Sequence, residues 1–190
     1  LLKDSSFRVY EGRTRLLIAK YYEDRGDHER AKNEYEQIRD DFPGSPASAM
    51  ALYRTGILHL QLYGDIGLAQ EYFQETGLEK SGSQADILAK EMLGHLSRLN
   101  KLTLNIHVAD SLAADSLKVE FSNDTAKINI EDDSKNVFAV GIDSVDSLSQ
   151  SLETLDDLFT IAEIYRDDIG LADSSVAYYE EIINRYPTSE

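Results

Sequence analysis

The sequence predicts an all-α fold in which antiparallel helix hairpins stack on one another as a solenoid. One observation behind this prediction is an internal repeat: two turn residues, a small residue and an aromatic residue return after 38 positions. They are Gly26, Asp27, Ala31 and Tyr35, and then Gly64, Asp65, Ala69 and Phe73. A second observation is a longer match after 144 positions, which includes Gly170, Ser175, Tyr179, Ile182, Tyr186 and Pro187.

The first helix of the first hairpin is predicted from the amphipathic stretch RTRLLIAKYYEDR, residues 13–25. Leu16, Ala19 and Tyr22 are spaced three apart, which places them on one helical face. Gly26 ends this helix because glycine adopts the left-handed backbone conformation without a side-chain clash. Asp27 then caps the next helix with its carboxylate.

The second helix carries one apolar stripe, formed by Ala31, Tyr35, Ile38 and Phe42 at steps of four, three and four. The small Ala31 lets the two helices approach closely, and Tyr35 fills the space one turn later. Pro43 ends the helix because proline lacks an amide hydrogen and pushes the preceding residue out of helical geometry. One such hairpin cannot bury both of its faces, which explains why the pattern repeats.

This pattern of small residue, tyrosine, glycine, alanine, aromatic and proline resembles the tetratricopeptide repeat. The resemblance is most specific over residues 12–45, and a second unit at 47–82 lacks the closing proline. The stretch SQADILAKEMLGHLSRL is similar to the first helix of a third unit, and residues 153–189 resemble a further unit. We therefore expect a block of about two and a half repeats at 1–100 and a further unit at 151–190.

The residue pattern of the repeats is similar to that of one branch of this superfamily. The pattern GD..RA...Y..I...FP.SP.A..A.YR.G resembles bacterial envelope proteins, namely the outer-membrane β-barrel assembly lipoproteins and the Tol-Pal-associated periplasmic repeat protein. This resemblance implies a place in the periplasm or on the inner face of the outer membrane. A cytoplasmic location is the alternative.

Residues 101–150 interrupt the repeats, and we interpret them as an irregular acidic insertion or linker. The pieces TLNIHV and AKINI alternate between apolar and polar residues as short strands do. Asp-Ser pairs recur in this segment, and each pair could cap a short helix. The polar composition is also typical of partly disordered chains.

The charge, the apolar runs and the motif content of the sequence argue against several classes of function. The formal charge of −16 opposes binding to nucleic acid, because the phosphate backbone is also negative. No apolar run reaches the roughly 20 residues that span a bilayer, so direct membrane insertion is not expected. The chain has no cysteine, no paired-histidine zinc motif and no phosphate-binding loop. We therefore predict no metal, no cofactor, no catalytic residue and no enzymatic activity.

The resemblance implies a protein-binding scaffold, because the first helices of tetratricopeptide repeats line a groove that receives a peptide or a partner helix. On or near this groove we expect Leu16, Lys20, Tyr53, Arg54, Ile57, Leu60, Ala89 and Lys90. Lys20, Arg54 and Lys90 would receive an acidic group of the partner. In the alternative interpretation these cations pair with neighbouring carboxylates of the chain itself.

Two other functions stay open from the sequence. The repeats could form a structural spacer or oligomerisation module, in which exposed faces stack on copies of the same chain or in a larger complex. They could also be an accessory region of a larger enzyme. Leu16 and Asp86 depart from the lysine, asparagine and arginine clamp of chaperone-binding members, which argues against a chaperone-tail receptor.

Overall fold

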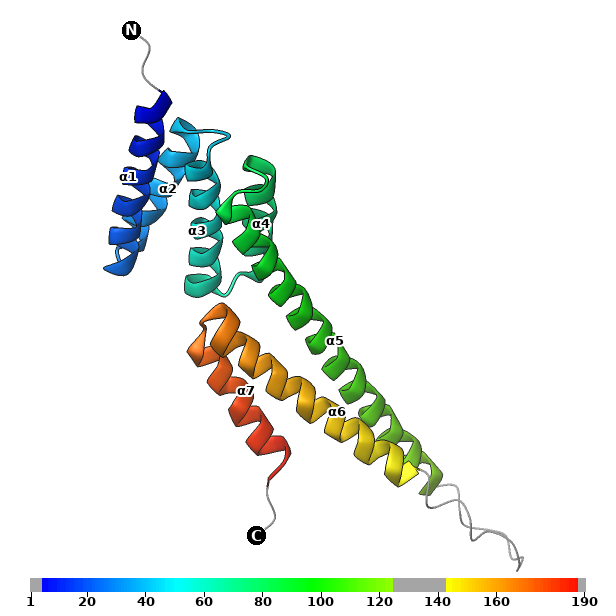
Figure 1. The fold of residues 1–190 in the computed structure, drawn as a ribbon. Helices are drawn as coiled ribbons and strands as arrows, with labels where there is room; N and C mark the ends of the chain where they lie inside the picture. The colour runs from blue at the N-terminus through cyan, green and yellow to red at the C-terminus, as the bar shows by residue number, and fades with distance from the viewer. Residues whose placement is uncertain (1–4, 125–142, 188–190) are drawn as a thin grey trace, which may run out of the picture. The chain divides into compact units, whose positions relative to one another are not determined.

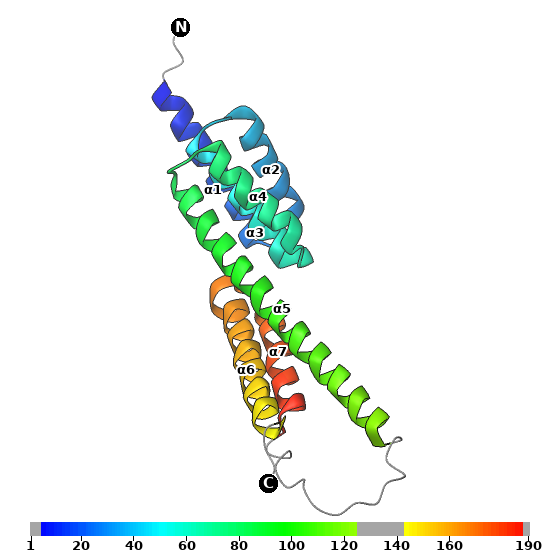
Figure 2. The same cartoon turned by 90° about the vertical axis from the view of Figure 1, so that its right-hand side faces the viewer.

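The computed structural model describes residues 5–124 and 143–187, with side chains described over 7–113 and 151–187. In these residues the chain is helical and contains no strand. Figures 1 and 2 show the helices as antiparallel neighbours within each part of the chain. The elements are α1 (Ser5–Asp24), α2 (His28–Asp41), α3 (Pro46–Tyr63), α4 (Ile66–Glu79), α5 (Gln84–Asp124), α6 (Asp143–Glu163), the π-helical turn η1 (Ile164–Ile169) and α7 (Ala172–Arg185).

The hairpin of α1 and α2 forms as its turn residues predict. Gly26 adopts φ 76°, a left-handed conformation that side chains disfavour. The Asp27 carboxylate accepts a 3.3 Å hydrogen bond from the amide of Arg30 and so caps α2. Phe42 and Pro43 directly follow the last helical residue, Asp41. The predicted start and end of the second helix are therefore confirmed.

The hairpin of α3 and α4 repeats this arrangement, with a close contact between its two helices. The α3 helix begins with proline after the capping side chain of Ser45, and Asp65 caps α4 through the amide of Leu68. A Cβ atom at Gly56 would lie 2.7 Å from the Phe73 ring. Glycine is thus the residue that allows α3 to touch α4 at this level.

One apolar cluster joins α1, α2 and α3. The α2 stripe predicted from the sequence is almost fully buried in it, and residues of α1 and α3 complete it. Its buried members are Ala19, Ala31, Tyr35, Ile38, Phe42, Ala51 and Leu58. The predicted all-α fold of stacked antiparallel hairpins is confirmed.

The interpretation of residues 103–108 as a strand is wrong, because TLNIHV lies inside the continuous helix α5. A helical stripe runs through this segment at steps of three and four: Leu96, Leu99, Thr103 and Ile106 face inward, and Leu96, Leu99 and Ile106 are at most 7% exposed. Asn105 donates a hydrogen bond to Asp157 of α6, and Arg185 of α7 pairs with Asp110. Packing against α6 and α7 therefore selects the helix.

The remainder of the predicted insertion divides into helical and undescribed parts. Residues 101–124 continue α5 and residues 143–150 begin α6, so these parts are helical rather than irregular. Two Asp-Ser pairs lie within α5 and do not start helices, whereas Asp143 is the first residue of α6. The predicted strand AKINI lies outside the described residues.

By its contacts the chain forms two compact units, residues 1–97 and 98–190. The first unit holds α1 to α4 and the beginning of α5. The second unit holds the rest of α5 with α6, η1 and α7. The predicted division at residues 100 and 150 stays a prediction.

Candidate functional site

The residues expected to line a groove lie on the first helices of the repeats, and they differ widely in exposure. Tyr53 and Ile57 on α3 are 9% and 8% exposed, whereas Leu60 is 1% exposed and packs in the core. Leu16 on α1 is half-buried, and Ala89 on α5 is buried. The role of these residues in binding a partner stays a prediction.

The three cations expected to receive an acidic partner are each paired within the chain. Lys20 Nζ lies 2.9 Å from Asp24 Oδ1, and Lys90 Nζ lies 2.9 Å from Asp86 Oδ2. Arg54 Nη1 lies 3.6 Å from Glu23 Oε1. The structure thus contains the pairing with neighbouring carboxylates that the alternative interpretation described.

Glu23 connects three helices of the first unit. The hydroxyl of Tyr35 on α2 donates a 2.7 Å hydrogen bond to Glu23 Oε2 on α1, while Arg54 on α3 approaches the other oxygen. The Glu23 side chain is only 13% exposed. Burial, together with the hydrogen bond to Glu23, raises the pKa of Tyr35 far above its usual value. This network holds Arg54 in place as a structural group.

Asp86 plays a similar part at the start of α5. Its Oδ2 atom accepts hydrogen bonds from Lys90 Nζ at 2.9 Å and from the Gly82 amide at 2.8 Å. The bond from Lys90, followed by that from Gly82, lowers the pKa of Asp86. The Asp86 side chain is 2% exposed, so its carboxylate interacts with the turn before α5 and with Lys90.

A cavity of about 640 Å³ lies in the first unit, beside the amino-terminal ends of α3 and α5. Its apolar lining includes Val9 and Leu16 of α1, Met50 of α3 and the ring of Phe42. Of the residues expected at the groove, Leu16 is the one that lines this cavity. The described structure therefore contains a hollow on the first-helix side of the repeats that a side chain of a partner could fill.

Two arginines give this cavity a positive rim. Arg8 donates a 2.8 Å hydrogen bond to the Asp41 carbonyl oxygen and lies over the Phe42 ring. Arg13 has no hydrogen-bond or ion-pair partner among the residues with described side chains. No aspartate or glutamate is among the lining residues. The adjoining amino-terminal ends of α3 and α5 add positive helix-dipole potential.

Sequence reasoning missed Arg8, Arg13 and Met50. The signal that could have identified the two arginines lies on α1, because Arg13 and Leu16 are three residues apart and so share a face. Following that face one turn toward the amino terminus reaches Val9 and its neighbour Arg8. The resemblance to known repeats predicts groove residues at other positions of the first helices instead.

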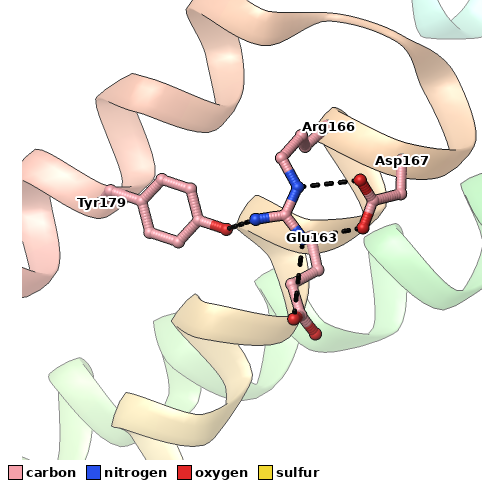
Figure 3. Close-up of polar contacts among 4 residues, drawn as sticks. All are labelled: Glu163, Arg166, Asp167 and Tyr179. Carbon is pink, nitrogen blue, oxygen red and sulfur yellow. Dashed lines mark hydrogen bonds and ion pairs between the residues drawn. The ribbon is translucent and has the colours of Figure 1, made fainter.

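The second unit contains an exposed polar cluster around Arg166 on η1 (Figure 3). Its guanidinium bonds both carboxylate oxygens of Asp167, at 2.8 and 2.7 Å, and donates a 2.8 Å bond to the Tyr179 hydroxyl of α7. Glu163 is 3.8 Å away. The hydrogen bonds from Arg166 lower the pKa of Asp167. Since these donors are occupied, the cluster fastens η1 to α7 and offers little to a ligand.

The π-helical turn itself has a simple cause. Ala19 precedes the turn glycine Gly26 by seven residues, whereas Ala162 precedes Gly170 by eight. Both alanines are buried and both glycines have φ 76°. One additional residue must therefore fit between two fixed points, and a π-helical turn accommodates it.

Neither metal binding nor membrane spanning is indicated by the part of the chain that the structure describes. Within it, no three histidine, aspartate or glutamate side chains are grouped so as to hold a metal ion. The helices there also lack a segment long and apolar enough to cross a bilayer.

Comparison with known proteins identifies the repeats. The family model of the tetratricopeptide repeat matches residues 13–45 and 158–189. These ranges correspond to the first and last units expected from the sequence, so the chain contains tetratricopeptide repeats. No curated protein and no solved structure matches the chain significantly. Repeats of this kind generally mediate protein–protein interactions, which indicates protein partners.

Proposed function

We propose that this chain, which carries tetratricopeptide repeats, is a non-enzymatic scaffold that binds a peptide or partner helix on the first-helix side of its first unit. The observation that carries the proposal is the cavity of about 640 Å³ with its apolar lining and arginine rim. A cavity of this size accommodates one or two large side chains. Because it lies beside α1, α3 and α5, an extended segment seated there would contact consecutive repeats.

The chemistry of the cavity favours a partner segment that carries a carboxylate next to an apolar anchor. Val9, Leu16 and Met50 would contact the anchor, and Arg13 would pair with the carboxylate. Arg13 is the first candidate because its guanidinium has no competing partner among the described side chains. By contrast, Lys20, Arg54 and Lys90 would have to give up Asp24, Glu23 and Asp86 before they could take the same role.

A peptide-display selection tests this proposal. We expect the chain to enrich peptides in which Asp or Glu lies beside a large apolar residue, and Arg13→Glu to reduce their affinity at least tenfold. The matched control is Arg39→Glu, because Arg39 is also an exposed arginine but lies outside the cavity lining. A second arm measures the affinity of the triple variant of Lys20, Arg54 and Lys90 to glutamate, and so tests whether these cations take the role assigned to Arg13. Equal binding by Arg13→Glu and the control would contradict the assigned site, and a selection without enrichment would contradict the scaffold function.

A place in the bacterial cell envelope is a further part of the proposal, on the periplasmic side or at the inner face of the outer membrane. This location is supported by the similarity between the residue pattern of the repeats and that of bacterial envelope proteins. Fractionation of cells that express the full-length protein at its native level tests it. Recovery with cytoplasmic markers would contradict the envelope location without affecting the binding proposal.

A further inference from the structure

The outward face of α1 carries an apolar stripe, which Thr14 interrupts between its two ends. Its members share one helical face, and the described side chains leave each of them at least 42% exposed. They are Phe7, Tyr10, Leu17, Ile18 and Tyr21. Single exposed apolar residues need no explanation, but a stripe of five on one helix face marks an interaction surface.

The internal repeat shows what kind of element fits this stripe. Ala19 of α1 corresponds to Gly56 of α3, 37 residues later, so Ile18 and Tyr21 correspond to Thr55 and Leu58. Thr55 and Leu58 are each 4% exposed, and Leu58 belongs to the apolar cluster that includes the α2 stripe. The face by which α3 packs on α2 is therefore the face that α1 leaves open. It is suited to receive the second helix of a repeat.

The last helix, α7, is such a second helix. Ser175 is 2% exposed and Ala31, its counterpart in α2, is fully buried. However, Tyr179 and Ile182 are only half-buried, whereas their counterparts Tyr35 and Ile38 are at most 1% exposed. The α7 stripe thus lacks the cover that α3 gives to α2.

Two exposed apolar residues extend the open face of α7. Val176 is 52% and Ile183 is 67% exposed, and they occupy the positions of Lys32 and Arg39 in α2. Lys32 lines a small cavity together with Thr55 and Leu58 of α3, so this position faces the following first helix. Valine and isoleucine at such positions are apolar where α2 has charges. This difference favours a covered surface on α7.

We propose that copies of this chain associate head to tail, with α7 of one copy packing on the outward stripe of α1 in the next copy. The contact would reproduce between two chains the packing of α2 on α3 within one chain. Val176 and Ile183 would meet Ile18, Tyr21 and their neighbours. Because the two surfaces differ, the interface is heterologous and can extend from copy to copy.

The charges of the two faces agree with this pairing. Asp173 and Glu180 each precede an exposed apolar residue of α7 by three positions, so they flank its open face. On α1, Arg25 donates a 2.9 Å hydrogen bond to the Tyr21 hydroxyl and lies over its ring. Both units are net acidic, and the unit that holds α7 is the more acidic one, with 19 acidic and seven basic residues in 98–190 compared with 16 and 12 in 1–97. Pairing of α7 with α7 of another copy would instead bring the acidic flanks of two α7 helices together.

Light scattering coupled to size exclusion tests the proposal with two variants. Tyr21→Glu places an acidic group opposite acidic α7, and Val176→Lys places a basic group opposite Arg25. We expect the mass of the unmodified chain to rise above 21.4 kDa as its concentration increases from about 10 µM to about 1 mM. Each variant alone should stay monomeric. An equal mixture should form complexes of two chains and no larger ones, since each variant keeps one intact face and the mixed pair exposes only the two altered faces.

The control is Leu78→Lys, which changes an 87% exposed leucine on α4 outside both faces. It should associate as the unmodified chain does, and circular dichroism should show unchanged helix content in all variants. A constant mass of 21.4 kDa at every concentration would overturn the proposal. Association of Val176→Lys alone, without restoration in the mixture, would also overturn it and would indicate pairing of α1 with α1.

Discussion

The hydroxyl of Tyr35 donates a 2.7 Å hydrogen bond to the carboxylate of Glu23, and this bond joins the two helices of the first repeat. The same carboxylate lies 3.6 Å from Arg54 of the following repeat. A residue whose aromatic ring fills the core by helical periodicity therefore also anchors a charged contact between repeats. Stability and the position of Arg54 both depend on it.

Tyr35→Phe should destabilise the first unit by about 1 to 2 kcal/mol, because Glu23 loses a neutral donor in a largely buried place while the ring still fills the core. Urea denaturation monitored by circular dichroism measures the change. Tyr10→Phe is the matched control, since Tyr10 is 68% exposed. Equal effects of the two substitutions would show that the hydrogen bond adds nothing to stability.

Ala31→Leu should destabilise the first hairpin by about 1 to 3 kcal/mol, because Ala31 is fully buried and a larger side chain overpacks the contact between α1 and α2. Asn33→Leu, at an exposed position of the same helix, should change the free energy of unfolding by less than about 0.5 kcal/mol. Thermal and urea unfolding of both variants provide the comparison. A larger effect at position 33 would contradict the register of the repeat.

His59 should make the first unit less stable in mild acid. Burial, followed by the charge of Lys32, lowers its pKa below 6.5, while Asp65 acts in the opposite direction. The unfolded chain therefore binds the proton more readily than the folded chain. The stability that the neutral ring contributes is complete above the unfolded pKa of 6.5 and is lost as the pH falls through 6.5 toward the folded pKa.

The measurement is the free energy of unfolding at about pH 7.5 and at about pH 5.5, for the unmodified chain and for His59→Gln. The variant cannot titrate in this range, so its stability should change less between the two values. His107→Gln is the control because His107 is exposed. An unchanged pH dependence in His59→Gln would show that other groups cause it.

Deletion of Asp168 should be tolerated, because it removes the one additional residue that η1 accommodates and lets α6 continue as a regular helix to Gly170. Deletion of Thr160 is the contrasting change. It lies in regular α6 and would rotate Leu158 by about 100° relative to Ile161, which takes a buried side chain out of the core. Melting temperatures measure both effects. Equal losses would contradict the insertion as the cause of the π-helical turn.

The hairpins can be predicted from the residue order alone, because their signals are local. Gly26, Asp27 and Pro43 act on neighbouring backbone groups, and the stripe from Ala31 to Phe42 depends only on helical spacing. For the same reason the repeated units can be recognised from residue order alone. Leu16, which lines the cavity, can also be placed on the first-helix face from helical spacing.

Contacts between distant residues fix the features that local patterns leave open. The segment TLNIHV alternates as a strand does, but contacts of α5 with α6 and α7 select the helix. The charges of Lys20, Arg54 and Lys90 are visible in the sequence, whereas their pairing with carboxylates depends on which helices lie side by side. The arginine-rimmed cavity likewise exists only where the ends of α1, α3 and α5 meet. Long-range packing joins residues that no periodicity relates, and this is the physical reason for the division.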